Sequence, residues 1–482
     1  MIDVRPVIHA ISRLAVAMGG LMMLPMAADL LRGDPNWRAF LAAGTVTILG
    51  GTMTALATPS RSGTLTLEQA FLLTSGLWIV LPVLGALPFM LGAPAASLTD
   101  AMFESMSGMS TTGATAFPRL DDLPRGTHLW RGLLQWSGGL GIVVVAMVFL
   151  PVMRVGGMQF FRSEGFDTLG KVMPRAGSIA LQLTEIYVGL TLACALTYAA
   201  LGLSGFDAIM HALTTCSTGG FSNYDASFGK FLGAPEIAAS VFTILASIPF
   251  VRMVQAMHGD LSPMWRDSQI RAYLAIIATL VATIVAYQVL WLGAPASTRL
   301  GTEVLFNVTT IISGTGYASV DVTQWGHLPF VLLIAAGLIG GCSGSTVCSI
   351  KVFRYQVLFE AVRGQLAAMQ SPHRVRPLRL QGRRLDADVV HSVMAMFTLF
   401  ILTFGLLIVA LALTGLHPRT ALTAAWTAIA NVGPAWGPEV TGNGSVANFP
   451  TTAKWLMIVG MYLGRLELIT VLVVLMPRFW RQ

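Results

Sequence analysis

Charged residues are scarce in this chain. Asp, Glu, Lys and Arg make up 11% of its 482 residues, whereas hydrophobic residues make up 54%. Because soluble domains carry about 25% charged residues, this composition excludes an ordinary soluble protein and indicates one that crosses a membrane several times. Apolar stretches close to the ~20 residues that a spanning helix needs recur along the chain. They predict about ten spans, near residues 6–31, 38–58, 67–93, 128–153, 179–203, 235–257, 271–294, 328–355, 389–415 and 452–476.

The sequence also lacks the patterns of common catalytic and metal sites. Its four cysteines form no Cys-x-x-Cys pair. Its eight histidines form no His-x-x-x-His pair, and it contains no Walker motif. We therefore expect neither an enzyme nor a resident cofactor. Cys194 is expected in the protein core, and Cys342 and Cys348 are expected to serve as small residues.

The basic residues are unevenly distributed. If the N-terminus is cytoplasmic, 20 of the 30 Lys and Arg residues fall on the inner side of the predicted spans, nine fall outside, and Arg465 falls within a span. This bias follows the positive-inside rule and predicts that both termini are cytoplasmic. The cluster Arg374–Arg384 is either a determinant of this topology or a docking surface for a cytosolic partner. No aromatic residues accompany it for stacking on bases, so nucleic-acid binding is not expected.

Four short segments share one pattern, a small or polar run followed by glycine at the mouth of an apolar hairpin. Their glycines, separated by 106, 97 and 117 residues, are Gly113, Gly219, Gly316 and Gly433. A repeat of this length in a membrane protein indicates that one unit was used four times. We expect an all-α fold in which four pseudo-fourfold repeats of helix, pore helix, filter and helix surround one pore, after an N-terminal helix pair. The predicted units are 1–62 (the helix pair), 63–176, 177–268, 269–386 (with a gating loop and a cytoplasmic segment) and 387–482.

A short helix, too brief to span the bilayer, precedes each glycine. In three repeats we expect it to begin near an acid, at Asp100, Asp207 and Glu303, which lie 13, 12 and 13 residues before the glycine. The fourth repeat has His417-Pro418 instead, and proline suits a helix start. The C-terminal end of such a helix carries partial negative charge. Pointed at the pore centre, it favours a cation.

A cation filter replaces the hydration shell of the ion with oxygen ligands. Backbone carbonyls can do this where the chain adopts conformations that glycine permits. We therefore predict that backbone carbonyls of these segments bind the ion. The candidate filter residues are Thr111, Thr112, Gly113, Ser217, Thr218, Gly219, Gly220, Gly314, Thr315, Gly316, Asn431, Val432 and Gly433.

The first, second and fourth segments carry a family resemblance. Residues 103–115 (FESMSGMSTTGAT) and 211–222 (HALTTCSTGGFS) closely resemble the first two pore loops of the Trk/Ktr/HKT potassium transporters, and Asn431-Val432-Gly433-Pro434 resembles the fourth. The extra N-terminal helix pair resembles the TrkH branch. This resemblance implies potassium translocation by a homodimer in the bacterial cytoplasmic membrane. It also implies a cytosolic TrkA-like regulatory subunit that binds nucleotide.

Two features bear on which ion passes. In the plant HKT branch, serine in place of the first filter glycine accompanies sodium preference, and this chain has Gly113. Many relatives have threonines where this chain has Ser313-Gly314, so the third segment predicts a looser filter. A less selective potassium and sodium transporter is one alternative. An alternating-access carrier of another substrate is a second, although such carriers are typically built from two inverted halves.

The helix after the third filter is interrupted by small residues. This stretch comprises Gly340, Gly341, Cys342, Ser343, Gly344, Ser345 and Thr346, and it is a poor continuous helix. It indicates either tight packing between helices or an unwound segment beneath the filter. The resemblance implies the second, an intramembrane gating loop.

Arg465 lies near the centre of the last predicted span, where a charge is costly unless it faces water or a partner. We expect it to face the pore or the gating loop. The resemblance implies that it constricts the pore. A structural ion pair with a buried acid is the alternative.

Overall fold

The computed structural model describes residues 2–59, 65–146, 153, 156–161, 176–371 and 377–481. Helices dominate these residues, and their two strands form one small antiparallel pair, β1 (Arg379–Leu380) with β2 (Arg383–Arg384). The expectation of an all-α fold is therefore confirmed. Residues 374 and 376 of the basic cluster, and the predicted boundary at residues 62–63, lie outside the described part of the chain.

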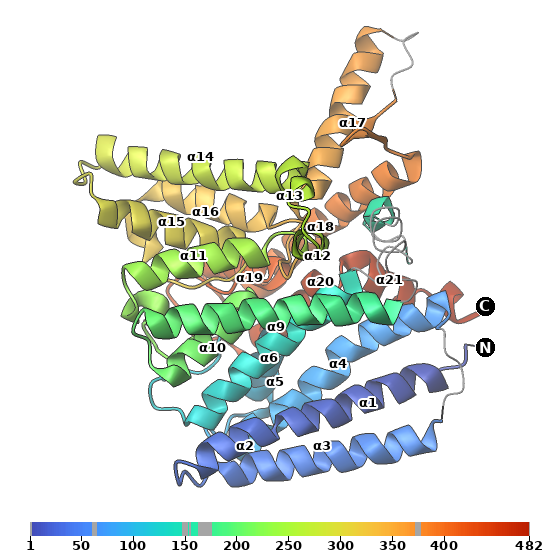
Figure 1. Ribbon diagram of the computed structural model, residues 1–482, viewed down its shortest axis with the longest axis vertical. Coiled ribbons are helices and arrows are strands. Elements are labelled where there is room, and N and C mark those ends of the chain that lie inside the picture. Colours follow the sequence, from blue (N-terminus) through green and yellow to red (C-terminus); the bar gives the residue numbers. More distant parts are fainter. Residues whose placement is uncertain are drawn as a thin grey trace.

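The N-terminal pair forms an antiparallel layer beside the rest of the molecule (Figure 1). Its first member is α1 (Arg5–Leu21), which α2 (Met23–Leu30) continues as one span, and its second member is α3 (Trp37–Ala57). Small residues let α1 and α3 approach closely, since a Cβ at Gly51 would lie 2.9 Å from the carbonyl oxygen of Ser12. Asp29 attaches the layer to the first repeat by accepting a hydrogen bond from the Gly126 amide (2.5 Å), and it also accepts one from the Asn36 side chain within the layer (2.7 Å).

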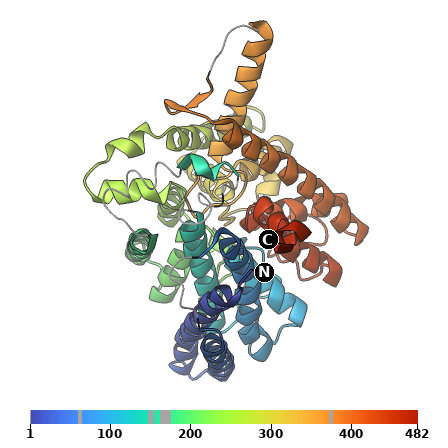
Figure 2. The same cartoon turned by 90° about the vertical axis from the view of Figure 1, so that its right-hand side faces the viewer.

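The same sequence of elements then occurs four times: a long helix, a short pore helix, an irregular segment and a second helix. The elements are α4 (Leu67–Leu91), α5 (Leu98–Met109) and α6 (Arg125–Val144); α9 (Ala176–Ala200), α10 (Gly205–Cys216) and α11 (Ala234–Ala246); α14 (Ser268–Leu290), α15 (Thr298–Ile312) and α16 (His327–Ile339); and α18 (Ala387–Leu413), α19 (Pro418–Ala430) and α20 (Thr451–Arg465). Figure 2 shows these groups following one another around a common centre in chain order. The last group packs against the first through α20 and α5.

The pore helices α5, α10, α15 and α19 begin at defined caps. Ser97, Ser204 and Ser297 cap the first three by accepting a hydrogen bond from the backbone amide three residues on. Pro418 occupies the first turn of α19, as expected. The prediction for Glu303 is wrong, because α15 starts at Thr298 and has no acid in its first turn. The Glu303 carboxylate instead forms an ion pair with the Arg299 guanidinium one turn earlier, at 3.8 Å.

Three predicted straight spans are broken. The span at 235–257 bends by 95° between α11 and α12 (Phe250–Met257), and the span at 452–476 bends by 104° between α20 and α21 (Leu468–Leu475). Pro249 ends the first helix because it cannot continue the backbone hydrogen bonds. Glu467, with φ +56°, breaks the second. In the span at 328–355, α16 stops at Ile339 and α17 (Val352–Gln370) begins only after an irregular loop.

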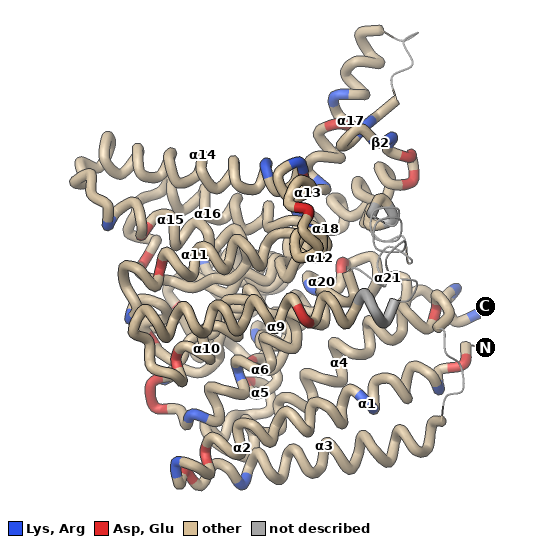
Figure 3. Tube along the Cα trace, viewed as in Figure 1, with Lys and Arg blue, Asp and Glu red and all other residues tan. Residues whose placement is uncertain are grey.

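The helices are arranged as in a multi-pass membrane protein. Among the described residues, six helices are long and apolar enough to cross a bilayer, and the two bent pairs raise this to eight. The other two predicted spans coincide with α6, which carries Arg125 and Arg131, and with α16, which has 13 residues. Figure 3 shows charged residues mostly at the helix ends, with Lys and Arg gathered around α13, the base of α17 and β2. The short remaining elements are α13 (Ser262–Arg266), η2 (Met158–Phe161), η3 (Ser227–Lys230), η4 (Val322–Trp325) and η5 (Pro477–Arg481).

Candidate ion filter and intramembrane loop

Each pore helix ends in three residues whose backbone alternates in handedness. The first and third of these have positive φ: Thr111 (+52°) and Gly113 (+84°), Thr218 (+51°) and Gly220 (+77°), Gly314 (+70°) and Gly316 (+73°), and Asn431 (+53°) and Gly433 (+112°). We call the four triplets 111–113, 218–220, 314–316 and 431–433 the filter segments. A backbone of alternating handedness can place successive carbonyl oxygens on one side of the chain, which is the arrangement of a carbonyl-lined ion filter.

This alternation corrects the register of the second segment. Gly220, not Gly219, is equivalent to Gly113, Gly316 and Gly433. With this register the third residue of the segment lies thirteen residues after Asp207, the same spacing as in the other two acid-containing repeats. Gly219 takes the middle position, and Ser217 lies outside the segment at the C-cap of α10.

The four segments close into a ring. A Cβ at Gly113 would clash with the carbonyl oxygen of Gly219, the middle residue of the next segment. A Cβ at Gly220 would likewise clash with the carbonyl oxygen of Thr315, and a Cβ at Gly316 with that of Val432. A Cβ at Gly433 would lie 2.9 Å from the carbonyl oxygen of Thr112. The last segment thus faces the first. The third position of every segment requires glycine both for its φ and for the approach of a neighbouring carbonyl.

Side chains behind the ring hold the segments in place. The Thr112 hydroxyl lies 2.7 Å from the Ser110 hydroxyl, and the Asn431 amide donates to it from the fourth segment (2.8 Å). In the third repeat, the Thr315 hydroxyl lies 2.8 Å from that of Ser313. Tyr317 follows the third segment and hydrogen-bonds Thr214 of α10 (2.5 Å). Each of these groups is buried, so the bonds form away from water.

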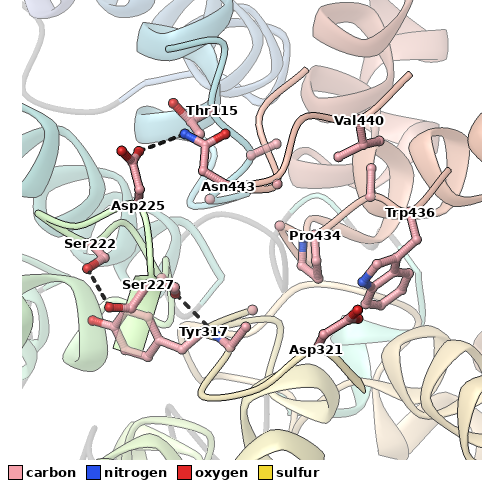
Figure 4. Close-up of a pocket in the computed structure, with 18 of the residues that line it drawn as sticks. Thr115, Ser222, Asp225, Ser227, Tyr317, Asp321, Pro434, Trp436, Val440 and Asn443 are labelled. Atoms are coloured by element: carbon pink, nitrogen blue, oxygen red, sulfur yellow. Dashed lines mark hydrogen bonds between the residues drawn. The ribbon is translucent and has the colours of Figure 1, made fainter. Parts of the chain in front are cut away.

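A cavity of about 570 Å³ opens beyond the third residues of the segments. Figure 4 shows Asp225 and Asp321 on different walls of this vestibule, with Asn443 reaching toward Asp225. The Asn443 amide donates to Asp225 (2.7 Å) and to the Pro118 carbonyl (2.9 Å). The loop after the fourth segment thereby contacts the loops after the first and second.

The vestibule contains fixed negative charge. Partial burial alone would raise the pKa of Asp321, but hydrogen bonds from the Thr323 hydroxyl (2.7 Å) and amide (3.0 Å) outweigh it and lower that pKa below its usual value. Asp321 is therefore ionised at neutral pH. Burial and a hydrogen bond to Asp207 raise the pKa of Tyr224 to about 12, so this phenol stays neutral. Arg131 and Arg419 also line the cavity.

The predicted interruption after the third filter is present as an irregular loop at residues 340–351. Gly340 (φ +74°) ends α16, and Gly344 (φ +79°) lies in the middle of the loop. Backbone hydrogen bonds join the loop to the bend of the second repeat, from the Phe250 amide to the Gly344 oxygen (2.9 Å) and from the Cys342 amide to the Ser247 oxygen (3.1 Å). Residues 340–346 are all buried.

This loop touches the filter directly. The hydroxyl of Thr346 accepts a hydrogen bond from that of Thr218, the first residue of the second segment, at 3.0 Å. The vestibule lies at the third residues, so the loop meets the opposite end of the filter. The loop therefore lies against the end of the ring that faces away from the vestibule.

Arg465 contacts the loop, as one of the two sequence-based interpretations expected. Its guanidinium donates to the Thr346 oxygen (3.2 Å), to the Cys348 sulfur (2.6 Å) and to the Gly138 oxygen on α6 (3.0 Å). The side chain is buried, and among the described residues no acid forms an ion pair with it. Within the part of the chain that the structure describes, the alternative of a structural ion pair therefore has no partner acid.

The sequence did not lead us to predict a second group of charged residues, which lies beside the loop. Glu467 forms ion pairs with Arg354 (2.5 Å) and Lys351 (3.7 Å), and all three side chains are buried. The Arg354 guanidinium also donates to the Gly156 oxygen (2.9 Å). Sequence reasoning placed Glu467 on a continuous helix, and the break at that residue could have been suspected only from the neighbouring Gly464.

A helical membrane protein whose four repeated loops close into a ring of backbone carbonyls fits the class of cation transport proteins. The chain is a member of the TrkH family of cation transport proteins, whose family model matches residues 37–481. This membership confirms the family resemblance and the expectation that the protein is not an enzyme.

Known relatives match over essentially the whole chain. The Trk system potassium uptake protein TrkI of Halomonas elongata is 38% identical over 479 residues, which are 99% of this chain and 97% of the relative. The corresponding protein TrkH of Escherichia coli is 34% identical over 99% of both chains. The crystal structure of the potassium transporter TrkH from Vibrio parahaemolyticus matches with a TM-score of 0.91 and 31% identity over 100% of both chains.

Proposed function

We propose that this chain is the potassium-translocating membrane subunit of a Trk-type uptake system. The observation that carries the proposal is the closed cycle in which each third-position glycine faces the middle carbonyl of the next segment. Such a ring offers a dehydrated monovalent cation several backbone oxygens at once. The C-terminal ends of four pore helices add negative potential there. Potassium is chosen because the relatives named above are potassium uptake proteins.

The loop at residues 340–346 acts as the gate in this proposal. It lies at the end of the filter opposite the vestibule, and Thr346 connects it to both Thr218 and Arg465. The positive charge of Arg465 discourages a cation from resting beneath the ring. Movement of the loop away from Thr218 would open the path, and the hydrogen bonds of Arg465 oppose that movement.

The proposed assembly is a homodimer in the bacterial cytoplasmic membrane with both termini cytoplasmic. A cytosolic TrkA-like subunit would dock on the inner face, where α17 and the β1–β2 hairpin project from the helices (Figure 1). Nucleotide would act through that partner. The described basic residues of this region include Arg363, Arg379 and Arg384, which suits an acidic partner surface or an anionic membrane surface.

A less selective potassium and sodium transporter is the second candidate. It is favoured by Gly314, which occupies a position where the other segments have Thr111, Thr218 and Asn431. Without a side chain, Gly314 forms no side-chain hydrogen bond to hold the third segment. This candidate has the same ion site as the first and differs only in how strictly it selects potassium over sodium.

The experiment that tests the proposal is cation flux into liposomes containing the purified protein. Potassium or rubidium uptake well above sodium uptake supports the first candidate, and equal rates support the second. Uptake that saturates with another solute and excludes potassium would contradict both. If the isolated protein shows no flux, the measurement is repeated with the TrkA-like subunit added, because the gate could be closed without it.

A further inference from the structure

The second filter segment lacks the side chain that supports its counterparts. Its middle residue is Gly219, whereas Thr112, Thr315 and Val432 occupy the equivalent positions. Thr112 and Thr315 each pair with the serine two residues earlier. Ser217 occupies the matching place in the second repeat and donates to the Thr214 oxygen (3.2 Å), as Ser313 does to the Thr310 oxygen (3.0 Å), but Gly219 offers it no hydroxyl to pair with.

Gln135, from α6 of the first repeat, occupies the space where that side chain would lie. A Cβ at Gly219 would overlap the Gln135 amide group, whose three heavy atoms are its nearest neighbours. The Gln135 Nε2 donates to the Gly219 oxygen (2.6 Å), and its Oε1 accepts from the Phe221 amide (3.0 Å). The side chain is fully buried. One amide thus fixes the peptide groups on both sides of Gly220.

The carbonyl that Gln135 holds belongs to the ring. The Gly219 oxygen is the middle oxygen of its segment and faces Gly113 of the first segment. Its distance from the equivalent oxygens of Thr112, Thr315 and Val432 sets the width that an ion meets. A shift of this oxygen weakens the match between the ring and one particular cation, because the energy of coordination depends on the number and distance of the oxygens.

We propose that Gln135 is a selectivity-determining positioning residue, which holds the second filter segment at the spacing that favours potassium over sodium. The inference rests on the proposed function, since it requires that the ring conducts ions. It assigns to a helix outside the filter the support that threonine hydroxyls give within the first and third segments. Loss of this support changes the ion ratio rather than only the amount of folded protein.

The first test replaces Gln135 by Met, which has similar length and neither donates nor accepts strongly. Gln288→Met is the matched control, because Gln288 is a buried glutamine of α14 that forms no hydrogen bond to a described filter residue. Rubidium and sodium uptake are measured on the same liposomes, so that their ratio does not depend on how much protein is active. We expect the ratio to fall about tenfold in Gln135→Met and to stay unchanged in Gln288→Met.

The outcomes separate this inference from the proposed function. A wild-type ratio in folded Gln135→Met overturns the inference and leaves the proposed function standing. A wild-type protein that passes no potassium, with or without the TrkA-like subunit, overturns the proposed function first. A reduced ratio in both glutamine variants overturns the inference, since the effect would not be specific to Gln135.

The second test introduces a threonine at position 219. It compares two variants with each other, so it does not depend on whether one particular variant folds. Gly219→Thr alone should disturb the second filter segment, because the threonine side chain would collide with Gln135. Gln135→Ala frees that space, so the double variant Gln135→Ala/Gly219→Thr places a threonine beside Ser217, as Thr112 lies beside Ser110. We expect the rubidium to sodium ratio of the double variant to exceed that of Gln135→Ala about threefold or more. A folded double variant that is no more selective than Gln135→Ala would overturn the inference.

Discussion

At the scale of single residues, the third glycine of each filter segment meets two demands at once. Its φ lies in the region that favours glycine, and the carbonyl of the next segment occupies the place of its Cβ. A substitution there must displace a ring oxygen, because no flexible side chain can give way. In the proposed filter, these positions would therefore link ion selectivity to the absence of a Cβ atom.

Gly113→Ser tests this link. The new Cβ would press on the Gly219 oxygen and require a strained left-handed serine, at a cost of about 1–3 kcal/mol. We expect the potassium to sodium ratio to fall about tenfold, measured by paired ion uptake in liposomes. Gly189→Ser is the control, because a Cβ at Gly189 has no described heavy atom within 4 Å. An unchanged ratio in Gly113→Ser would count against the filter assignment.

Asp321→Asn tests the charge of the vestibule. Because the pKa of Asp321 is lowered, its negative charge would be lost only as pH falls through that lowered value. Removing the charge should raise the KM for potassium about twofold at low salt, less at high salt, and equally at pH 5.5 and 7.5. Asp122→Asn changes an exposed acid that does not line the cavity and should leave KM unaltered. A pH-dependent effect would contradict the assignment of a fully ionised Asp321.

The sequence could locate the four candidate filter segments better than it could fix their register. The glycine and hydroxyl residues were found because the same pattern occurs four times. The adjacent pair Gly219-Gly220 left two registers possible, and only the alternation of φ distinguishes them. Gln135 could not be found at all, since its role depends on contact with a segment 84 residues away.

At the scale of elements, the loop between α16 and α17 is held from three directions. The bend of the second repeat, the first residue of a filter segment and Arg465 of α20 each contribute hydrogen bonds to it. The loop can move only if several of these bonds break together. Such an arrangement suits two discrete positions more than a continuous range.

Arg465→Ala should raise potassium flux. It removes the hydrogen bonds to Thr346, Cys348 and Gly138, and it removes a positive charge beneath the ring. We expect an increase of about fivefold or more in initial uptake, normalised to folded protein in the liposomes. Arg478→Ala, an exposed arginine of η5, is the control and should conduct as the wild type does. Folded Arg465→Ala with unchanged or lower flux would contradict the gating role.

The elements were predictable where local signals agree, and not where tertiary contacts decide. Apolar stretches located the long helices, acids near the start located α5 and α10, and the run of glycine and serine located the loop. The bends at Pro249 and Glu467 were missed because each lies within an apolar stretch of spanning length. Such breaks are stable only because neighbouring elements supply hydrogen bonds to the freed backbone groups.

At the scale of the whole molecule, buried charges join the repeats around the ring. Arg131 of α6 pairs with Glu104 of α5 (2.7 Å), donates to the Ser222 oxygen of the second repeat (2.7 Å) and lies 4.1 Å from the ring centre of Phe221. Both charged side chains are almost completely buried. This contact fixes the first repeat against the second directly beside the filter.

Arg131→Leu should destabilise the fold strongly. It leaves the Glu104 carboxylate buried without its ion-pair partner, which costs about 3–5 kcal/mol. The midpoint of thermal unfolding in detergent should fall clearly. Arg119→Leu removes an exposed pair with Asp122 and should cost less than about 1 kcal/mol. Similar midpoints for the two variants would show that the buried pair is not a main connection between the repeats.

The closure of the ring within one polypeptide has a consequence for how such a pore can change. In a pore assembled from four identical subunits, one codon alters all four walls together, and mixed subunits give a population of different pores. Here Gly219 can lack a side chain while Thr112 and Thr315 keep theirs. Each quarter of the wall can therefore diverge by itself, and every molecule carries the same combination. If the ring selects ions as proposed, its selectivity can be adjusted in single steps that a symmetric assembly does not permit.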